Sequence, residues 1–285
     1  MAKEPLVIHN PGFPRSNTYD PDWVMDNQMG PNALWLMEWL GRDMDLKPGM
    51  RVLDLGCGTA MTSIFLAREF QVQVWAADLW VNQDENWERV RKAGVEDLVC
   101  PLRLEAHSLP FAFEFFDAMV SADSYQYFGT DVLYLSYLVR FLKPQGRIGI
   151  VVPGLMQAFT KGIPDHLTRK QSNGAAFWEE DCTSFLTLQR WRDLWEQSNR
   201  VDLLTADTLT EGWRFWRDFE LALEQTGKNR FPSAAEALDA DQGRFIGFIR
   251  LIGARKSGQA GVNLYDSGLI ATMEKAGLLK ANESI

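Results

Sequence analysis

The stretch that decides the fold is VLDLGCGT, residues Val52–Thr59. A short apolar run leads into Gly-x-Gly, and the apolar side chains of residues 60–70 then recur at helical spacing. Glycine at both positions lets the backbone turn sharply and lets a ligand approach where a Cβ would clash. The start of the following helix offers unpaired N–H groups to a polar or anionic ligand. The stretch therefore predicts a strand–turn–helix unit with a ligand at its turn.

Short apolar strands and helices alternate on both sides of this turn. Strands are expected at 51–55, 72–77, 102–104, 116–121, 147–152, 201–205 and 245–253, and helices at 32–40, 60–70, 85–92, 132–142, 185–197 and 213–223. Continuous apolar strands are typical of parallel sheets that are buried on both faces. Alternation with helices implies right-handed crossovers. The predicted fold class is α/β, with a doubly wound, mostly parallel seven-stranded sheet, helices on both faces and a Rossmann-like organisation.

Composition shifts divide the chain into three parts. Residues 1–30 are rich in Pro, Asn, Asp and Gly and are expected to form an N-terminal arm or cap. The main domain is expected over 31–256, with lid insertions near 154–183 and 210–242, because long segments of this kind are usually functional. Residues 257–285 are expected to form a C-terminal tail.

Composition also excludes several classes of protein. The chain has 285 residues and a net charge of −9, so phosphate backbones would repel it and nucleic acid is not expected as a partner. Its three cysteines form no CxxC pair, and the histidines do not flank them at metal-ligand spacing, which argues against a disulfide framework or a metal site. The sequence has no signal-like segment and no apolar run of ~18 residues. A cytoplasmic enzyme without integral membrane association is expected.

The residues around the turn indicate which kind of ligand it suits. A dinucleotide fingerprint would read Gly-x-Gly-x-x-Gly/Ala, and Met61 occupies the last of these positions. An acid, Asp54, stands two residues before the first glycine, where it would repel a pyrophosphate and suit an ammonium group. A nicotinamide dehydrogenase is therefore disfavoured.

In this context VLDLGCGT resembles the first motif of the class I S-adenosylmethionine-dependent methyltransferases of small molecules. Four further segments resemble later motifs of that family in the same order: Asp78 at the end of the second strand, EAHSLPF at 105–111, FDAMVS at 116–121 and LKPQGR at 142–147. The family more often has Asp where this chain has Glu105. The resemblance implies the Rossmann-like methyltransferase fold, S-adenosyl-L-methionine as the cofactor and S-adenosyl-L-homocysteine as its product.

The resemblance also implies positions around the methionine part of the cofactor. Gly56, Cys57 and Gly58 would shape the turn beneath the methionine and ribose, and Asp54 would lie near the methionine ammonium. Ser121, at the end of the fourth strand, would lie near the methionine moiety.

The nucleoside part would be held by the ends of the second and third strands. By the same resemblance, Asp78 would accept from both ribose hydroxyls, as an acid at this place does in related folds. Leu79 and Trp80 would cover the adenine face. Glu105 would accept from the adenine amino group, and the Ala106 N–H would reach a ring nitrogen.

The arm from Asn17 to Asn32 resembles the N-terminal cap of small-molecule members, which would bring Tyr19 to the methionine carboxylate; a surface turn is the alternative. The Tyr19-Asp20 pair also raises cyclopropane-type lipid modification as an alternative function. The sequence offers neither a basic membrane-facing helix nor a Cys/Glu/His set for a bicarbonate site.

Catalysis is expected to depend on alignment of the acceptor and exclusion of water. The candidates lie where strands end: Tyr125 and Tyr127, with Asp123 and Ser124 beside them, and His166 in the segment after the fifth strand. His166 is the first choice for a base because an unperturbed imidazole titrates near ~6.5. A packing role for His166 in the lid is the alternative.

Eleven tryptophans are many for this length, and several gather in the C-terminal part. Aromatic faces bind cationic amines, and they also build ordinary cores. Trp213 and Trp216, like Trp191 and Trp195, are three or four residues apart, which favours core packing.

The predicted function is transfer of a methyl group from S-adenosylmethionine to a small-molecule acceptor, with no metal. A catalytically silent cofactor-binding module is a second alternative. The acceptor is expected between the end of the fourth strand and the C-terminal aromatic helices. The sequence leaves open the accepting atom and the oligomeric state.

Overall fold

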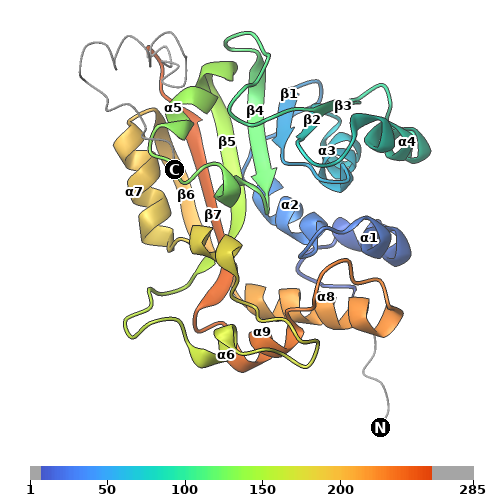
Figure 1. Ribbon diagram of the computed structural model, residues 1–285. Helices are drawn as coiled ribbons and strands as arrows, with labels where there is room; N and C mark the ends of the chain where they lie inside the picture. Colours follow the sequence, from blue (N-terminus) through green and yellow to red (C-terminus); the bar gives the residue numbers. More distant parts are fainter. Residues whose placement is uncertain (1–7, 259–285) are drawn as a thin grey trace, which may run out of the picture.

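The computed structural model describes residues 8–258, and seven strands form one sheet in the order β3-β2-β1-β4-β5-β7-β6 (Figure 1). The strands are β1 (Arg51–Leu55), β2 (Gln73–Asp78), β3 (Val99–Arg103), β4 (Phe116–Ala122), β5 (Leu142–Leu155), β6 (Val201–Thr208) and β7 (Ile246–Arg255). The first five run parallel, and β7 is antiparallel to both β5 and β6. The predicted seven-stranded, mostly parallel α/β sheet is confirmed.

Strand β1 lies in the middle of the parallel part. Asp54 of β1 stands level with Ala76 of β2 on one side and with Val120 of β4 on the other. The strand order reverses between β1 and β4, and in open α/β sheets ligands bind at the carboxyl ends of the strands at such a switch point. The topology therefore places a site where the VLDLGCGT turn leaves β1.

Helices cover both faces of the sheet. They are α1 (Pro21–Asn27), α2 (Ala33–Gly41), α3 (Met61–Phe70), α4 (Gln83–Ala93), α5 (Tyr134–Leu138), α6 (Asp165–Thr168), α7 (Leu188–Ser198), α8 (Gly212–Thr226) and α9 (Ala235–Asp241), with 3₁₀ turns at Ser16–Thr18, Tyr125–Tyr127, Val139–Phe141 and Glu180–Ser184. The core has two parts, one with α2 and α3 and the other with α5 and α7. Trp191 and Trp195 are completely buried in the second, as their spacing predicted.

The N-terminal arm contains a helix that hydrophobic periodicity does not reveal. Asp20 caps α1 by accepting from the Trp23 N–H at 3.1 Å, and Pro21 opens the helix with a preset φ. Asn32 caps α2 by accepting from the N–H groups of Leu34 and Trp35. The Asp20-Pro21 pair was the available sequence signal for α1, because a capping residue and a proline mark the start of this helix and an apolar stripe does not.

The helix expected over 132–142 is shorter than predicted. It consists of α5 and one 3₁₀ turn, and Leu142 already pairs with Phe116 in the sheet. The next pair joins Ala118 to Arg147, so residues 143–146 bulge out of the ladder. Pro144 cannot donate a ladder hydrogen bond, which is why a bulge forms here. Residues 143–146, which separate the expected helix 132–142 from the expected strand 147–152, are thus an irregularity inside β5.

The two segments expected as lids pack beyond the carboxyl ends of the parallel strands. Residues 154–183 contain α6 and a 3₁₀ turn, and residues 210–242 contain α8 and α9, of which α9 was not predicted. Figure 1 shows α6, α8 and α9 together below the arrowhead of β4. No helix within residues 8–258 combines the length and apolar character needed to cross a membrane. The predicted tail lies outside the described residues from 259 onward.

Candidate functional site

The turn after β1 leaves little room for a Cβ. Gly56 and Gly58 have φ values of 76° and 54°. A Cβ on Gly56 would lie 2.1 Å from the Ser124 Oγ, and one on Gly58 would lie 2.8 Å from the Met29 sulfur. Glycine is required at Gly56 for both conformation and space, whereas at Gly58 the positive φ favours glycine and the flexible Met29 side chain could move aside. The turn is thus enclosed by the arm on one side and by the segment after β4 on the other.

Asp78 ties the end of β2 to this turn. Its Oδ2 accepts from the Gly58 N–H at 2.8 Å, and its Oδ1 accepts from the N–H groups of Trp80 and Val81 at 2.8 and 2.9 Å. A carboxylate offers about four acceptor positions, so Oδ2 keeps one for a further donor. Gly58 and Asp78, which were each expected at the cofactor site, are therefore in direct contact at the switch point.

Asp54 lies deeper than the resemblance implies. It is completely buried, and its Oδ2 accepts from the hydroxyls of Thr62 and Ser63 on α3, both at 2.6 Å. Within the described residues its Oδ1 has no hydrogen-bond partner. Burial raises the pKa of the Asp54 carboxyl to about 6, against the opposing effect of the two hydroxyls. As placed here, Asp54 joins β1 to α3 and has no surface with which to touch a methionine ammonium.

The residues expected around the nucleoside lie at the ends of β2 and β3. Leu79 and Trp80 are exposed, Trp80 by 71%, and the Trp80 ring lies 6.2 Å from the Tyr127 ring. Glu105 accepts from the backbone N–H and the Nδ1 of His107 at 2.9 and 2.8 Å. The Ala106 carbonyl is held by the Tyr134 hydroxyl at 3.1 Å.

Ser121 and Cys57 lie against the turn. The Ser121 hydroxyl is 2.7 Å from that of Ser124, which in turn donates to the Leu55 carbonyl at 3.0 Å. The Cys57 side chain is buried, and burial raises the pKa of its thiol well above the ordinary value. Cys57 is therefore a packing residue whose backbone, rather than its sulfur, belongs to the turn.

Tyr19 lies elsewhere than expected. Its ring packs on Phe65 of α3, and its hydroxyl donates to Glu69 at 3.2 Å. Glu69 is at the far end of α3 from the glycine turn, roughly 12 Å along the helix at 1.5 Å per residue from Met61. The expected contact between Tyr19 and a methionine carboxylate is therefore not present, because the arm crosses α3 near its C-terminus.

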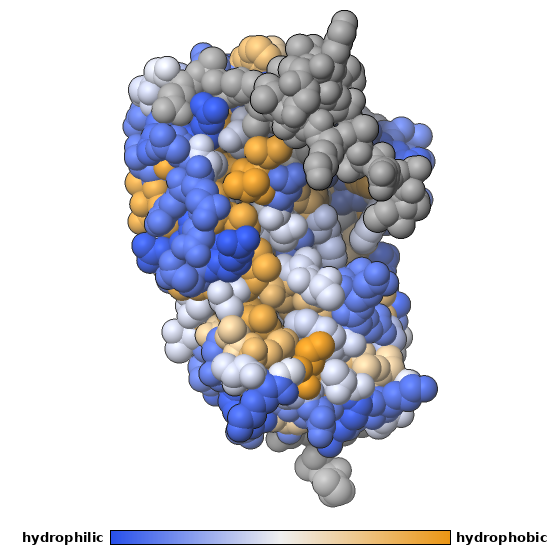
Figure 2. Space-filling view, turned by 60° about the vertical axis from the view of Figure 1, so that its left-hand side comes forward, coloured by the Kyte–Doolittle hydropathy of each residue, from blue (hydrophilic) through white to orange (hydrophobic). Residues whose placement is uncertain are grey.

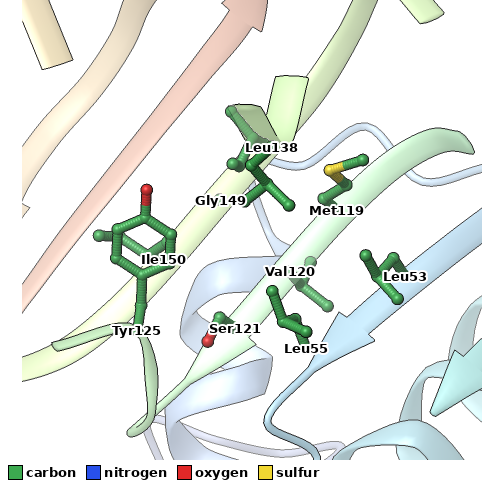
Figure 3. A pocket seen from close by; sticks show the side chains of 10 residues that line it. Leu53, Leu55, Met119, Val120, Ser121, Tyr125, Leu138, Gly149 and Ile150 are labelled. Atoms are coloured by element: carbon green, nitrogen blue, oxygen red, sulfur yellow. The ribbon is translucent and has the colours of Figure 1, made fainter. Parts of the chain in front are cut away.

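Of the two tyrosines expected at the carboxyl edge, Tyr125 is buried. Its ring packs against Trp191 and Phe128 in the core. Figure 3 shows that its hydroxyl points back along the sheet beside Ile150, away from Ser121 and the end of β4. The pocket drawn there is a small apolar void inside the core. Tyr125 is a core residue in this structure and not a group that an acceptor could reach.

His166 is also placed in a structural contact. Its Nε2 lies 2.8 Å from the Oδ1 of Asp241, which is fully buried in α9. The other Asp241 oxygen accepts from the N–H groups of Phe245 and Ile246. This arrangement fastens α6 to α9 and to the start of β7. The packing alternative describes His166 here, and the expected position as a base facing the acceptor is not observed.

A pocket of about 260 Å³ opens beside the glycine turn, and we call it the cap pocket. Its wall contains the arm residues Gln28–Pro31, Asp123 and Tyr127 after β4, Pro153, several residues between Gln171 and Phe185, Trp216, Glu220 and Leu223 of α8, and Asn229–Ala234. It lies between the end of the fourth strand and the C-terminal aromatic helices, where an acceptor was expected. Tyr127 is half exposed and lines it.

Two acids in the cap pocket titrate abnormally. Burial raises the pKa of Asp123 and of Glu220 to about 7 each. The charge of Glu220 adds to the rise at Asp123, and the charge of Glu224 adds to the rise at Glu220. Burial likewise raises the pKa of Tyr127 to about 12, so its hydroxyl stays protonated at neutral pH. The sequence pattern placed Asp123 beside the tyrosine candidates without a role, and it did not point to Glu220. The available signal for Glu220 was its position one helical turn after Trp216.

One face of the molecule carries a broken band of hydrophobic residues between hydrophilic borders (Figure 2). No group of three or more His, Cys, Asp or Glu residues within 8–258 is arranged to hold a metal ion. The candidate site consists of a glycine turn, the acid Asp78 that contacts it, exposed side chains after β2 and a partly apolar pocket with two acids.

Comparison with known proteins agrees with this geometry. The model of a methyltransferase domain matches residues 53–150. The methyltransferase GfsG of Streptomyces halstedii is 33% identical over 133 residues, which are 46% of this chain and 48% of that protein. A glycine/sarcosine/dimethylglycine N-methyltransferase of Actinopolyspora halophila is 28% identical over 145 residues, 49% of this chain and 26% of that protein. The matches thus span half or less of these relatives' lengths.

Among solved structures, the [4+2]-cyclase SpnF shares the fold, with a TM-score of 0.59 and 21% identity over 82% of this chain and 85% of that one. The matched domain contains β1, the glycine turn, Asp78 and β4. Residues 53–150 thus match a methyltransferase domain, and the ordered motifs and sheet topology of the chain are similar to those of the class I S-adenosylmethionine-dependent methyltransferases.

Proposed function

We propose that this chain transfers a methyl group from S-adenosylmethionine to a small molecule bound in the cap pocket. The observation that carries the proposal is the contact between Asp78 and the Gly58 N–H at the switch point of the sheet. It supports a ribose-binding role for Asp78, because this acid lies beside a turn in which a Cβ on Gly56 or Gly58 would meet a neighbouring side chain, next to a pocket of small-molecule size.

The residues at the turn fit the cofactor. The free acceptor position of the Asp78 Oδ2 suits a ribose hydroxyl, and the exposed Leu79 and Trp80 side chains offer an apolar surface to a purine. Glu105 and the backbone of Ala106 stand at the end of β3, where an adenine edge would lie. When bound, S-adenosylmethionine supplies an electrophilic methyl group on a positively charged sulfur.

The chain's own contribution would be alignment and exclusion of water. The arm covers Gly58 through Met29, and α8 and the segment 171–185 close the cap pocket from the other side. Holding two reactants in one orientation accounts for a large part of the barrier reduction in such reactions. His166 and Tyr125 take no part in this proposal, because neither lines the cap pocket.

Calorimetry with S-adenosylhomocysteine tests the proposal. Asp78→Ala removes a charge-assisted acceptor worth on the order of 1.5–3 kcal/mol, so binding should weaken roughly tenfold or more. Asp97→Ala removes an equal charge from an exposed turn before β3 and should leave binding unchanged. Thermal unfolding of both variants checks that the Gly58 turn survives. Equal affinities for the two variants would refute the ribose assignment.

A methyl-acceptor screen separates the alternatives. Because the [4+2]-cyclase SpnF shares this fold, the fold does not by itself imply methyl transfer. Release of S-adenosylhomocysteine with a small acceptor would support the proposal. Cofactor binding without turnover on any small molecule or lipid would favour the silent module, and turnover restricted to unsaturated lipid would favour cyclopropane-type chemistry.

A further inference from the structure

The cap pocket holds two carboxyl groups that have no positively charged partner within the described residues. Asp123 accepts from the Gln126 side chain at 3.2 Å, and Glu220 accepts from the Trp216 indole N–H at 3.0 Å. Glu220 is only 8% exposed. The Ala234 backbone and the Ser233 side chain also form hydrogen bonds with Glu220 that favour its ionised form. Within the described residues, no cation is among the groups that shift the pKa of either acid, and a nearby carboxylate raises each pKa: Glu220 that of Asp123, and Glu224 that of Glu220. Asp123 is partly buried. Acids in such surroundings either bind a proton or pair with a cation.

The remaining charged and titratable groups near these acids are mostly negative or neutral. Glu179 and the neutral Cys182 line the same pocket, Asp181 lies close to Tyr127, and Glu224 stands one turn beyond Glu220. Among the described residues, the one cationic side chain in the wall is Arg230, which is exposed, as Glu179 is, so the charges inside the pocket are those of Asp123 and Glu220. The interior of the pocket therefore has an excess of negative charge.

Aromatic side chains complete the wall. Phe177, Phe185, Trp216 and Phe231 all line the pocket together with Tyr127. The Trp216 ring is fixed by Phe177, 5.7 Å away, and by Phe248, 5.3 Å away. Aromatic faces attract cations, and the attraction grows when the cation is desolvated. The two acids and the aromatic faces of this cavity therefore favour the same kind of ligand, which is a cation.

We propose, on the basis of the proposed function, that the cap pocket takes an acceptor whose reacting group is a cationic amine, with Asp123 and Glu220 as its counter-charges. Neutral alcohols and carboxylic acids of the same size would bind less well, because neither would neutralise the two acids.

Asp123 also lies next to the place where the cofactor would react. The following residue, Ser124, covers Gly56, while the Asp123 Oδ2 would be 2.9 Å from a Cβ on Gly30 of the arm. An ammonium nitrogen must lose a proton before its electron pair can react. An N–H bond breaks and an O–H bond forms when Asp123 takes that proton, and a pKa of about 7 suits this exchange near neutrality. The proton then leaves to solvent.

The test is binding of benzyltrimethylammonium to the full chain saturated with S-adenosylhomocysteine, measured by calorimetry at pH 6 and pH 8. This probe keeps its charge at every pH, so any pH effect belongs to the protein. Since both acids ionise as the pH rises through about 7, affinity should increase roughly tenfold between the two values. Benzyl alcohol and benzoate should bind at least tenfold more weakly at pH 8.

Glu220→Gln and Asp123→Asn should each weaken the probe severalfold at pH 8 and flatten its pH dependence. Glu96→Gln removes one charge from an exposed turn and should change neither. If one acid variant fails to fold, the other still decides the outcome. Equal binding of benzyl alcohol and the ammonium probe, or a probe affinity indifferent to both substitutions, would overturn the proposal.

Two further outcomes separate this inference from the proposed function. If S-adenosylhomocysteine itself does not bind, the proposed function fails first. If the variants lose affinity for S-adenosylmethionine but not for S-adenosylhomocysteine, and the ammonium probe is unaffected, the acids serve the sulfonium charge and the amine proposal is wrong.

Discussion

At the scale of single residues, Asp54 shows how a motif residue can be conspicuous in sequence and inaccessible in structure. Its place before the glycine turn suggested a ligand contact, but β1 is central and its side chain points into the layer between sheet and α3. A sequence shows that an acid stands near a turn. Which face the acid points to depends on helix packing, which is decided by residues far along the chain.

Asp54→Asn should stabilise the ligand-free protein at pH 8, and roughly half as much at pH 5, where the folded carboxyl is protonated but the unfolded one is already ionised. The folded pKa of about 6 lies above the ordinary value, so the folded state binds more protons between these values and loses stability as the pH rises. A shift of about two units corresponds to ~3 kcal/mol as an upper bound. Urea unfolding at both pH values measures the difference. A loss of stability at pH 8 would mean that the charged carboxylate has a favourable partner.

At the scale of elements, the strands and turns that short local motifs specify could be predicted from the sequence. The position of the N-terminal arm could not. The glycine turn, Asp78 and β4 follow from short motifs, since strand, glycine and acid are adjacent in sequence. Tyr19, Tyr125 and His166 were misplaced because their surroundings come from α3, α7 and α9. Glu220 was missed because only the folded chain brings α8 to the end of β4.

Helix α1 is held to the end of α8 by charge. Lys228 lies 2.8 Å from Asp22 and 2.9 Å from Asp26, and its carbonyl accepts from the Gln28 side chain. Lys228→Met should therefore speed amide exchange in α1 severalfold at low salt, with a smaller effect at high salt because ion pairs near the surface are screened.

Hydrogen exchange followed by mass spectrometry measures the effect peptide by peptide. Lys92→Met removes a lysine that forms no ion pair within the described residues and serves as the matched control. Exchange in β1 and β4 should be unchanged in both variants. Unchanged exchange in α1 of the Lys228 variant would show that packing alone, such as that of Met25 and Val24, holds the arm.

At the scale of the whole molecule, the site is assembled from both ends of the described chain. The arm, the ends of β1, β2 and β4, and α8 with the loop after it all meet there. A ligand that binds among them binds only the folded state, so it stabilises the domain as a unit. Which ligand stabilises the domain therefore tests the whole site, built from all of these elements, and not a single contact.

S-adenosylhomocysteine should raise the unfolding temperature and NAD should not. At a concentration 100 times its dissociation constant, a ligand adds about 2.7 kcal/mol, which shifts a chain of this size by several degrees. NAD would need a small residue where the buried Met61 opens α3, because a dinucleotide turn packs its helix closely against the strand at that position. Thermal scans with each ligand at equal concentration measure the difference. An equal shift with NAD would contradict the assignment of the turn to S-adenosylmethionine, and Asp78→Ala should abolish most of the shift with S-adenosylhomocysteine.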